Sequence, residues 1–305
     1  MDARILPLPF DPAGMRGLSE KLLQSHHQNN YGGAVKRLNA IRAQLAANPA
    51  ATLSGFALNG LKREELIATN SMLLHELYFA SLAPDGQAMV PAMALALAAN
   101  FGSADAWRAE FMAMGRALGG GSGWVLLSFQ PREGSLVNQW ASDHGHALAG
   151  GVPLLALDMY EHAYHLDHGA NAGAYVDAFM AHIDWAAVYA RYQHAVHAAS
   201  EDFGTGPEAL DGATLLDVRR AGVYAQATTR IPGARWRDPA AVGRWAAELP
   251  ADRPVVVYCV YGHEVGRATA MRLRAAGLDA HYLQGGIDAW TSAGRPLDGK
   301  QEAPS

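Results

Sequence analysis

The stretch VPLLALDMYEHAY, residues 152–164, places a carboxylate and an imidazole four positions apart, directly after an apolar run. The run Val152–Leu157 predicts a buried strand, so Asp158 would stand at the end of that strand and His162 one helical turn later. A carboxylate and an imidazole at the edge of a core are typical of a metal site. We therefore take Asp158 and His162 as candidate metal ligands.

Two distant histidines complete a candidate ligand set. His26 and His75 lie in segments with helical apolar spacing, residues 19–47 and 61–82. The short connection between these segments predicts an antiparallel helical pair, which can bring both imidazoles to facing positions. Three neutral imidazoles and one carboxylate can hold a redox-active first-row metal and leave one coordination position open. The positive charge that remains would attract a small anion and acidify bound water.

Length and composition limit the class of protein. The 305 residues predict two domains, and an apolar fraction of 50% is enough to fill two cores. The net charge of -5, with both signs spread along the chain, indicates neither a nucleic-acid partner nor a membrane surface. We expect no signal peptide in residues 1–12 and no membrane span. Cys259 is the single cysteine, which excludes an internal disulfide and makes a cytoplasmic location the default expectation.

The rest of the first part predicts an α+β region. We expect the helical hairpin to occupy residues 1–86 and an α/β part with a three-stranded antiparallel sheet to occupy residues 87–199. The expected elements of that part are helices at 89–100 and 103–118, strands at 124–129, 135–141 and 152–158, and further helices to about residue 199.

Composition changes at residues 200–212, where Gly, Pro, Ser and acidic residues cluster, and we predict a linker there. The remainder, residues 213–300, alternates short apolar runs with helical segments. Such alternation predicts a parallel sheet covered by helices on both faces. The expected strands lie at 215–218, 255–258 and 281–283, and the expected helices at 239–249, 264–276 and 286–293.

From about residue 6 to residue 192 the chain resembles the iron/manganese superoxide dismutase family. The segments that carry the resemblance are HH at 26–27 with LN at 38–39, HELYF at 75–79, GSGW at 121–124, DMYEHAY at 158–164, and IDW at 183–185 with Tyr189 and Tyr192. The resemblance implies that His26, His75, Asp158 and His162 bind one iron or manganese ion per chain. It also implies the family's reaction, which converts two superoxide anions to dioxygen and hydrogen peroxide.

The chain departs from the family around these ligands. Family histidine, tyrosine and tryptophan positions are replaced by Asn30, Ala34, Phe79 and Tyr160. His144 aligns near the glutamine that hydrogen-bonds metal-bound solvent in the family, and the small Ser71 leaves room for it. The resemblance therefore implies His144 as an outer-sphere donor, with Trp124 beside the ligands. Tyr31 is a candidate replacement for the hydroxyl lost at Ala34, the family's gateway tyrosine position.

The resemblance also implies a homodimer that forms through the metal-site face. Glu161 matches the glutamate that bonds a metal-ligating histidine of the partner subunit in the family. His165 stands where a tyrosine usually faces the partner's gateway histidine, and that histidine is Asn30 here. We therefore expect His165 and Asn30 to form an altered contact across the dimer.

A second candidate site lies at Cys259, at the end of the apolar run Val255–Tyr258. The residues that follow, Val260, Tyr261, Gly262, His263 and Glu264, predict a tight anion loop before a helix. Backbone N–H groups and the helix dipole lower the pKa of a thiol in such a place and can hold an anion. The alternative is a buried, inert cysteine.

Residues 212–297 resemble a rhodanese domain. The motifs are LLDVR at 215–219, IPGA at 231–234, the cysteine loop, and GGIDAW at 285–290. In that family the loop cysteine carries sulfur as a persulfide. The usual loop arginines are missing here, and Glu264 would repel thiosulfate. Val265 also rules out a Cys-x5-Arg phosphatase loop.

Three functions remain open at this point. The first is superoxide dismutation at an iron or manganese ion. The second is a metal-binding redox sensor without turnover, which the replacements at Ala34 and Asn30 motivate. The third is sulfur transfer by Cys259 with a structural metal site. The substrate of the first function is the superoxide anion.

Overall fold

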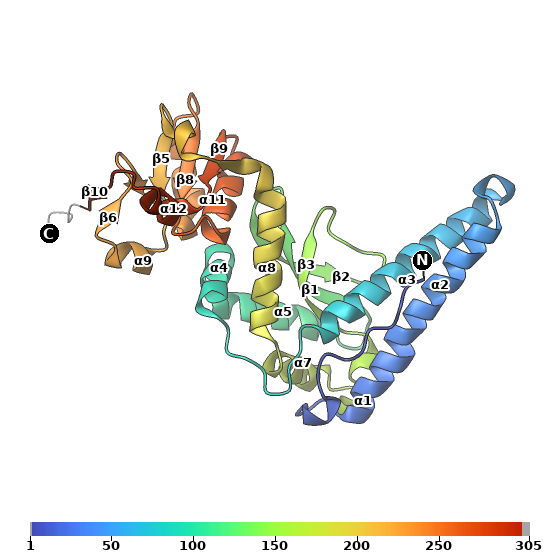
Figure 1. Ribbon diagram of the computed structural model, residues 1–305. Coiled ribbons are helices and arrows are strands. Elements are labelled where there is room, and N and C mark those ends of the chain that lie inside the picture. Colours follow the sequence, from blue (N-terminus) through green and yellow to red (C-terminus); the bar gives the residue numbers. More distant parts are fainter. Residues whose placement is uncertain (1, 301–305) are drawn as a thin grey trace. The chain divides into compact units, whose positions relative to one another are not determined.

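The computed structural model describes residues 2–300 of the chain (Figure 1). The chain divides into two compact units, and each is described by itself. The first unit comprises Met1–Met93, Asp105–Ser128 and Asn138–Tyr189, and the second comprises Ala94–Ala104, Phe129–Val137 and Ala190–Ser305.

The predicted helical hairpin is present, with one difference in its first arm. That arm consists of α1 (Glu20–Ser25), a π-helix (His26–Tyr31) and α2 (Gly32–Ala47), and the second arm is α3 (Gly55–Phe79). We expected one continuous α-helix over 19–47. A π-helix makes its hydrogen bonds one residue further along the chain than an α-helix, and such segments are frequent at functional sites. Here the π-helix begins at His26, one of the candidate ligands.

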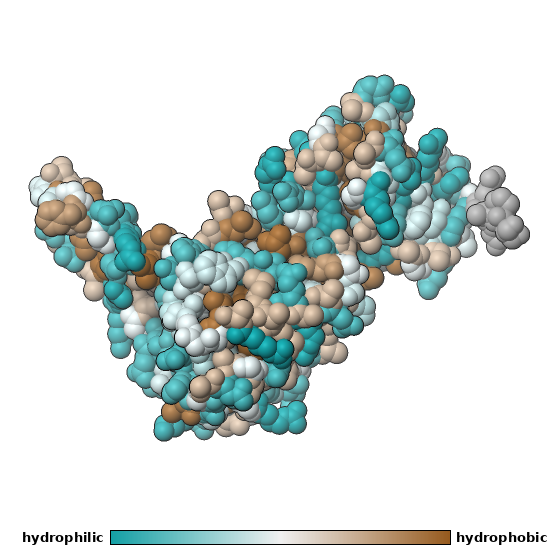
Figure 2. Space-filling model, turned by 180° about the vertical axis from the view of Figure 1, so that it is seen from behind, coloured by the Kyte–Doolittle hydropathy of each residue, from teal (hydrophilic) through white to brown (hydrophobic). Residues whose placement is uncertain are grey.

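The two arms of the hairpin pack along an apolar seam. Leu38 and Ile41 of α2 form a buried cluster with Ala68 of α3, and α2 and α3 lie side by side in Figure 1. The hydroxyl of Ser19 caps the first arm because it accepts the N–H of Leu22 at 3.1 Å. Figure 2 shows apolar patches on a mainly hydrophilic surface, and the exposed apolar side chains of α3 include Phe56, Leu66 and Leu73.

A three-stranded antiparallel sheet follows, as predicted, in the order β2-β1-β3. The strands are β1 (Trp124–Gln130), β2 (Ser135–Ala141) and β3 (Val152–Asp158), and the neighbouring helices are α4 (Pro91–Phe101), α5 (Ala104–Ala117), α6 (His165–His168), α7 (Ala172–Ala181) and α8 (Trp185–Ser200). Strand β1 is central and buried over its first six residues, which explains its continuous apolar sequence. Helix α3 packs against β3, so the second arm of the hairpin meets the strand that ends in Asp158.

The second unit contains a five-stranded parallel sheet in the order β4-β9-β8-β5-β7. Its strands are β4 (Gly204–Thr205), β5 (Thr214–Asp217), β7 (Arg235–Trp236), β8 (Val255–Tyr258) and β9 (Ala280–Leu283). Two more short strands, β6 (Thr229–Arg230) and β10 (Asp298–Gly299), pair antiparallel. Residues 200–212, predicted as a linker, hold β4, which pairs with β9.

Both faces of this sheet are covered, as the βα alternation predicted. Val255 and Val257 of β8 belong to one apolar cluster, and Val256 and Tyr258 belong to another. Successive side chains of a strand point to opposite faces, so the two clusters lie on the two faces of the sheet. The helices of this unit are α9 (Ala221–Gln226), α10 (Val242–Trp245), α11 (Glu264–Ala275) and α12 (Gly286–Ser292).

The prediction of one continuous helix over residues 239–249 is wrong. The segment consists of α10 between two 3-10 turns, Pro239–Ala241 and Ala246–Glu248. The carbonyl of Asp238 accepts the N–H of Ala241 at 3.0 Å and the indole N–H of Trp245 at 2.9 Å. This tertiary contact of the indole favours a tight first turn over a regular α-helix. Among residues 2–300, no helix combines the length and the apolar character that crossing a membrane requires.

Candidate metal centre

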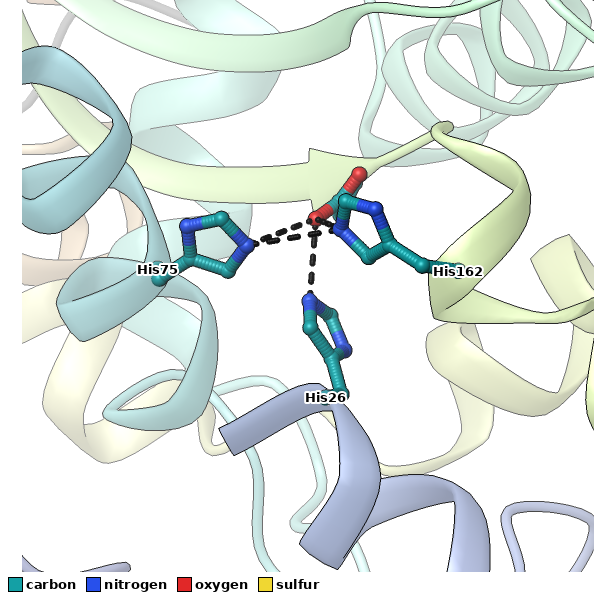
Figure 3. A group of neighbouring side chains, drawn as sticks. His26, His75 and His162 are labelled. Atoms are coloured by element: carbon teal, nitrogen blue, oxygen red, sulfur yellow. Dashed lines mark hydrogen bonds and ion pairs between the residues drawn. The ribbon is translucent and has the colours of Figure 1, made fainter. Parts of the chain in front are cut away.

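The four candidate ligands converge on one point (Figure 3). Oδ2 of Asp158 lies 3.0 Å from Nε2 of His26 and 3.2 Å from Nε2 of His162. Nε2 of His75 lies 3.4 Å from the same oxygen and 3.4 Å from Nε2 of His162. One donor atom from each residue lies within 4.8 Å of all the others. These distances fit a single ion held by three imidazoles and a carboxylate, which is a ligand set for iron or manganese.

Each ligand is positioned by the end or the irregularity of an element. His26 opens the π-helix, His75 lies in the last turns of α3, and Asp158 is the last residue of β3. His162 follows in a 3-10 helix, Glu161–Ala163, so its side chain returns toward Asp158. The ligands thus come from both arms of the hairpin and from the sheet.

Hydrogen bonds around the ligands leave their donor atoms facing the common point. Nδ1–H of His75 donates to the carbonyl of Ser71 at 2.6 Å, so Nε2 of His75 carries the free lone pair. Oδ1 of Asp158 accepts the N–H of Tyr160 at 2.9 Å, so Oδ2 is left to the imidazoles. Nδ1 of His26 is buried and has no hydrogen-bond partner among the described residues.

Burial and mutual charge set the protonation of the cluster. Burial lowers the pKa of His26 and lowers that of His75 to about 3, so both imidazoles are neutral near pH 7. Burial opposes ionisation of Asp158, but the imidazoles of His162 and His26 outweigh it, and the pKa of Asp158 lies well below its usual range. The site therefore presents two neutral imidazoles, those of His26 and His75, and an ionised carboxylate, which are the states that bind a metal cation.

The lowered histidine pKa values predict acid sensitivity of the metal-free protein. A histidine whose pKa falls on folding binds fewer protons when folded, so stability is lost as the pH falls from about 6.5 to about 3. The free energy of unfolding should fall by up to about 1.4 kcal/mol per pH unit for each such histidine. Hydrogen exchange of the α3 amides at several pH values measures this loss. In His75→Gln the slope should be shallower, and an unchanged slope would contradict the assignment.

Aromatic rings enclose the cluster. The ring centroid of His26 lies 5.0 Å from Tyr78 and 5.1 Å from Phe79, and that of His75 lies 5.3 Å from Trp124. His26, His75 and Asp158 are buried, whereas the side chain of His162 is 26% exposed. A surface pocket opens on this side, and it is lined by Gly120, Gly121, Ser122, Tyr160, Glu161 and His162. A small anion can therefore reach the cluster from the side of His162.

His144 lies beside the ligands. Its ring centroid is 6.1 Å from that of His75, and its Nδ1 accepts the indole N–H of Trp124 at 3.0 Å. Because Nδ1 is an acceptor, the ring proton of neutral His144 is on Nε2. Burial lowers the pKa of His144, which favours this neutral form.

The hydroxyl of Tyr31, the candidate replacement for the gateway hydroxyl, has hydrogen-bond partners in two segments. Its hydroxyl donates to Oε1 of Glu76 at 2.9 Å and accepts the N–H of Leu6 at 2.8 Å. Burial raises its pKa to about 12. Glu76 follows His75 directly, so Tyr31 connects the N-terminal segment to the second ligand helix. Ala34 is buried one turn further along the first arm.

The two residues expected at a dimer face lie on the surface of this chain. Glu161 and His165 are both exposed, and Glu161 lines the pocket beside His162. Asn30 is half-buried in the π-helix. The exposure of Glu161 and His165 leaves both side chains accessible to a second chain.

The loop of the second unit forms a backbone cradle around Cys259. Backbone N–H groups of Gly262, His263 and Gly266 point to its sulfur. The carbonyl of Cys259 accepts the N–H of Ile287 at 3.0 Å, so the start of α12 supports the loop. A side chain at Gly286 would place its Cβ 2.5 Å from the carbonyl oxygen of Cys259, which explains a glycine there.

Burial dominates the chemistry of this thiol. Cys259 is only 5% exposed, and burial raises its pKa despite the backbone N–H groups. Glu264 at the start of α11 is also buried and forms an ion pair with Arg220 at 3.0 Å. Val260, Tyr261 and His263 complete the loop, and Tyr261 is exposed. An acidic residue thus stands where an anion-binding loop would require a basic one.

Two contacts of the site could not be found in the sequence. Asn70 donates its side-chain N–H to the carbonyl of His144 at 2.6 Å, and Glu76 accepts from Tyr31. Asn70 is five residues before His75 on α3, and no motif marks it. Glu76 lies inside the HELYF segment, so its position next to a ligand was the only available signal.

Two family models match the chain. Residues 89–191 match iron/manganese superoxide dismutases, C-terminal domain, and residues 202–293 match the rhodanese-like domain. The two matches follow one another along the chain. They agree with the three-stranded sheet, whose strand β3 ends in Asp158, and with the parallel sheet, whose strand β8 ends just before Cys259.

Relatives cover 62% to 64% of the chain. A superoxide dismutase [Fe] of Cupriavidus metallidurans is 64% identical over 190 residues, which are 62% of this chain and 96% of that protein. A superoxide dismutase [Mn] 1 of Haloferax volcanii is 35% identical over 64% of this chain and 97% of its own length. A superoxide dismutase [Fe] of Aquifex aeolicus is 34% identical over 63% of this chain and 93% of its own length.

Proposed function

The chain belongs to the iron/manganese superoxide dismutase family, and on this premise we propose that it converts two superoxide anions to dioxygen and hydrogen peroxide. The observation that carries the proposal is the convergence of His26, His75, Asp158 and His162 within 4.8 Å. Three imidazoles and an ionised carboxylate fit one iron or manganese ion per chain. Such an ion, when bound, supplies the one-electron exchange with superoxide.

The chain's own residues support this reaction in three ways. The buried rings of Tyr78, Phe79 and Trp124 lie against His26 and His75 and shield these ligands from bulk water, whereas His162 is partly exposed. The pocket on that side admits a small anion. His144 holds its proton on Nε2 and is the candidate outer-sphere donor to solvent at the centre.

The proposal includes an assembly and a location. Glu161 and His165 are exposed, and Glu161 lines the pocket beside His162. This supports a homodimer formed through the metal-site face, with Asn30 as the candidate partner contact. The single cysteine supports a cytoplasmic location. A direct test is sedimentation of the metal-loaded protein with and without Glu161→Lys. A lysine there should dissociate the dimer, and an unchanged sedimentation coefficient would oppose this face as the interface.

A sensor without turnover is the competing function, because Ala34 and Asn30 replace proton-delivery residues of the family. We expect the double variant Ala34→Tyr and Asn30→His to consume superoxide only slightly faster than the unmodified protein. A restored proton donor can increase a rate by about 10²-fold, and the expected increase is far smaller than this. The reason is that His144 already stands beside the ligands. Stopped-flow consumption of superoxide by metal-loaded samples measures the gain. A rise from near zero to full activity would favour the sensor.

Sulfur transfer by Cys259 is the second candidate, favoured by the three N–H groups around its sulfur and by the rhodanese-like match. If the loop is active, the protein should form thiocyanate from cyanide and a sulfur donor, and Cys259→Ser should lose all of it. We expect thiosulfate to be a poor donor because Glu264 lies at the loop. Glu264→Gln is then expected to increase turnover with thiosulfate. The absence of thiocyanate with every donor would eliminate this function.

A further inference from the structure

We propose that Asn70 and Tyr160 are positioning residues that fix the imidazole of His144 beside the metal centre. The inference rests on the proposed function, in which His144 is the outer-sphere donor. Asn70 and Tyr160 would thus act on the metal centre without binding the ion. No sequence motif marks Asn70, and Tyr160 stands where the family has a tryptophan.

His144 needs external anchors because its own segment is irregular. It lies in the turn that follows β2, which ends at Ala141. The side chain of Asp143 accepts the N–H of Gly145 at 2.6 Å, which tightens the turn without contacting the imidazole. A ring on such a turn is free to rotate unless other elements hold it.

Side chains from three parts of the fold contact His144, and each of these parts carries or contacts a metal ligand. Asn70 of α3 donates to the carbonyl of His144 at 2.6 Å, five residues before His75. Trp124 at the start of β1 donates to Nδ1 of His144 at 3.0 Å, and its ring meets His75 edge-on at 5.3 Å.

Tyr160 provides the third anchor through its ring. It stacks on His144 with a centroid distance of 4.7 Å and an interplanar angle of 11°. Its ring also lies 5.4 Å from the ring of His162 at 16°, so Tyr160 is sandwiched between His144 and a ligand. The backbone N–H of His144 also points to its hydroxyl. Tyr160 thus sets the plane of His144 parallel to that of His162.

Together these contacts fix the direction of the Nε2–H bond of His144. The indole of Trp124 fixes which nitrogen carries the proton, Asn70 fixes the backbone of the turn, and Tyr160 fixes the plane of the ring. Groups that orient a donor near a metal tune its reduction potential and activity. Loss of Asn70 or of the Tyr160 ring should therefore act through His144.

The test combines three variants with the His144→Ala background. Asn70→Ala and Tyr160→Leu are each expected to shift the reduction potential of bound iron in the same direction as His144→Ala, and to lower kcat by about tenfold. Tyr160→Phe keeps the stacked ring, so its shift should be smaller than that of Tyr160→Leu. Metal content per chain, measured on the same samples, should stay near that of the unmodified protein.

Repeating the variants in the His144→Ala protein distinguishes an effect that acts through His144 from a general loss of order around the metal centre. In His144→Ala, Asn70→Ala should not shift the potential further. Tyr160→Leu should shift it less than in the unmodified protein, because the Tyr160 ring also lies against His162. Equal shifts in both backgrounds, or none in either, would overturn the inference. The matched control is Asn48→Ala, because Asn48 also donates to a backbone carbonyl, at 2.8 Å, but is exposed at the end of α2. A protein with full metal and no dismutation would reject the proposed function, while the potentials would still decide the positioning of His144.

Discussion

Asp158→Asn is expected to empty the metal centre and to abolish superoxide consumption. Asp158 is fully buried among three imidazoles, and those imidazoles hold its pKa well below the usual range. Asparagine keeps the shape but removes the only negative charge that the four ligands supply, so a cation would face neutral donors alone. Metal content should fall to below about a tenth of an ion per chain. Superoxide consumption should fall by more than about 100-fold, which is the loss expected when a residue that only orients a ligand is removed.

The matched control for this variant is Asp177→Asn. Asp177 is an exposed acid that pairs with Arg116 at 2.9 Å, and surface pairs of this kind contribute little. Elemental analysis and a superoxide assay on both variants decide the outcome. The ligand assignment is wrong if Asp158→Asn retains a full complement of metal, or if Asp177→Asn loses as much metal as Asp158→Asn.

His144→Ala is expected to have the second largest effect, and of a different kind. The ring of His144 is 6.1 Å from that of His75 between centroids, and it is not among the four residues that converge. Its loss should leave metal content unchanged and lower the turnover of superoxide by about 10- to 100-fold, because an outer-sphere donor tunes the centre without binding the ion.

His146→Ala is the control for His144→Ala. His146 lies two residues further along the same turn, is exposed, and contacts the hydroxyl of Ser142 at 3.0 Å through Nδ1. Turnover by His146→Ala should equal that of the unmodified protein. Equal losses in the two variants would assign the effect to the turn as a whole, and unchanged turnover in His144→Ala would remove His144 from the reaction.

The sequence was most informative where chemistry and element boundaries coincide. Asp158 follows an apolar run of strand length, and the structure ends β3 at that residue. His75 lies on a helical face whose apolar partners repeat regularly, and α3 carries it to the cluster. Such positions depend on local pattern, so they could be predicted before any fold was known.

The features that the sequence did not reveal depend on contacts between distant residues. The π-helix at His26 changes the register of one turn, and no apolar repeat records such a change. Asn70 reaches His144 across 74 positions of the chain. Strand β4 is two residues long and is a strand only because β9 lies beside it. Residue pattern alone does not carry this information.

The central claim is that His26, His75, Asp158 and His162 hold one ion at which superoxide is consumed. The direct measurement is metal quantification and a superoxide assay on the same purified sample. We predict close to one iron or manganese ion per chain and consumption of superoxide well above that of an equal amount of free metal. A sample with near-stoichiometric metal and no consumption above the free-metal control would contradict the account.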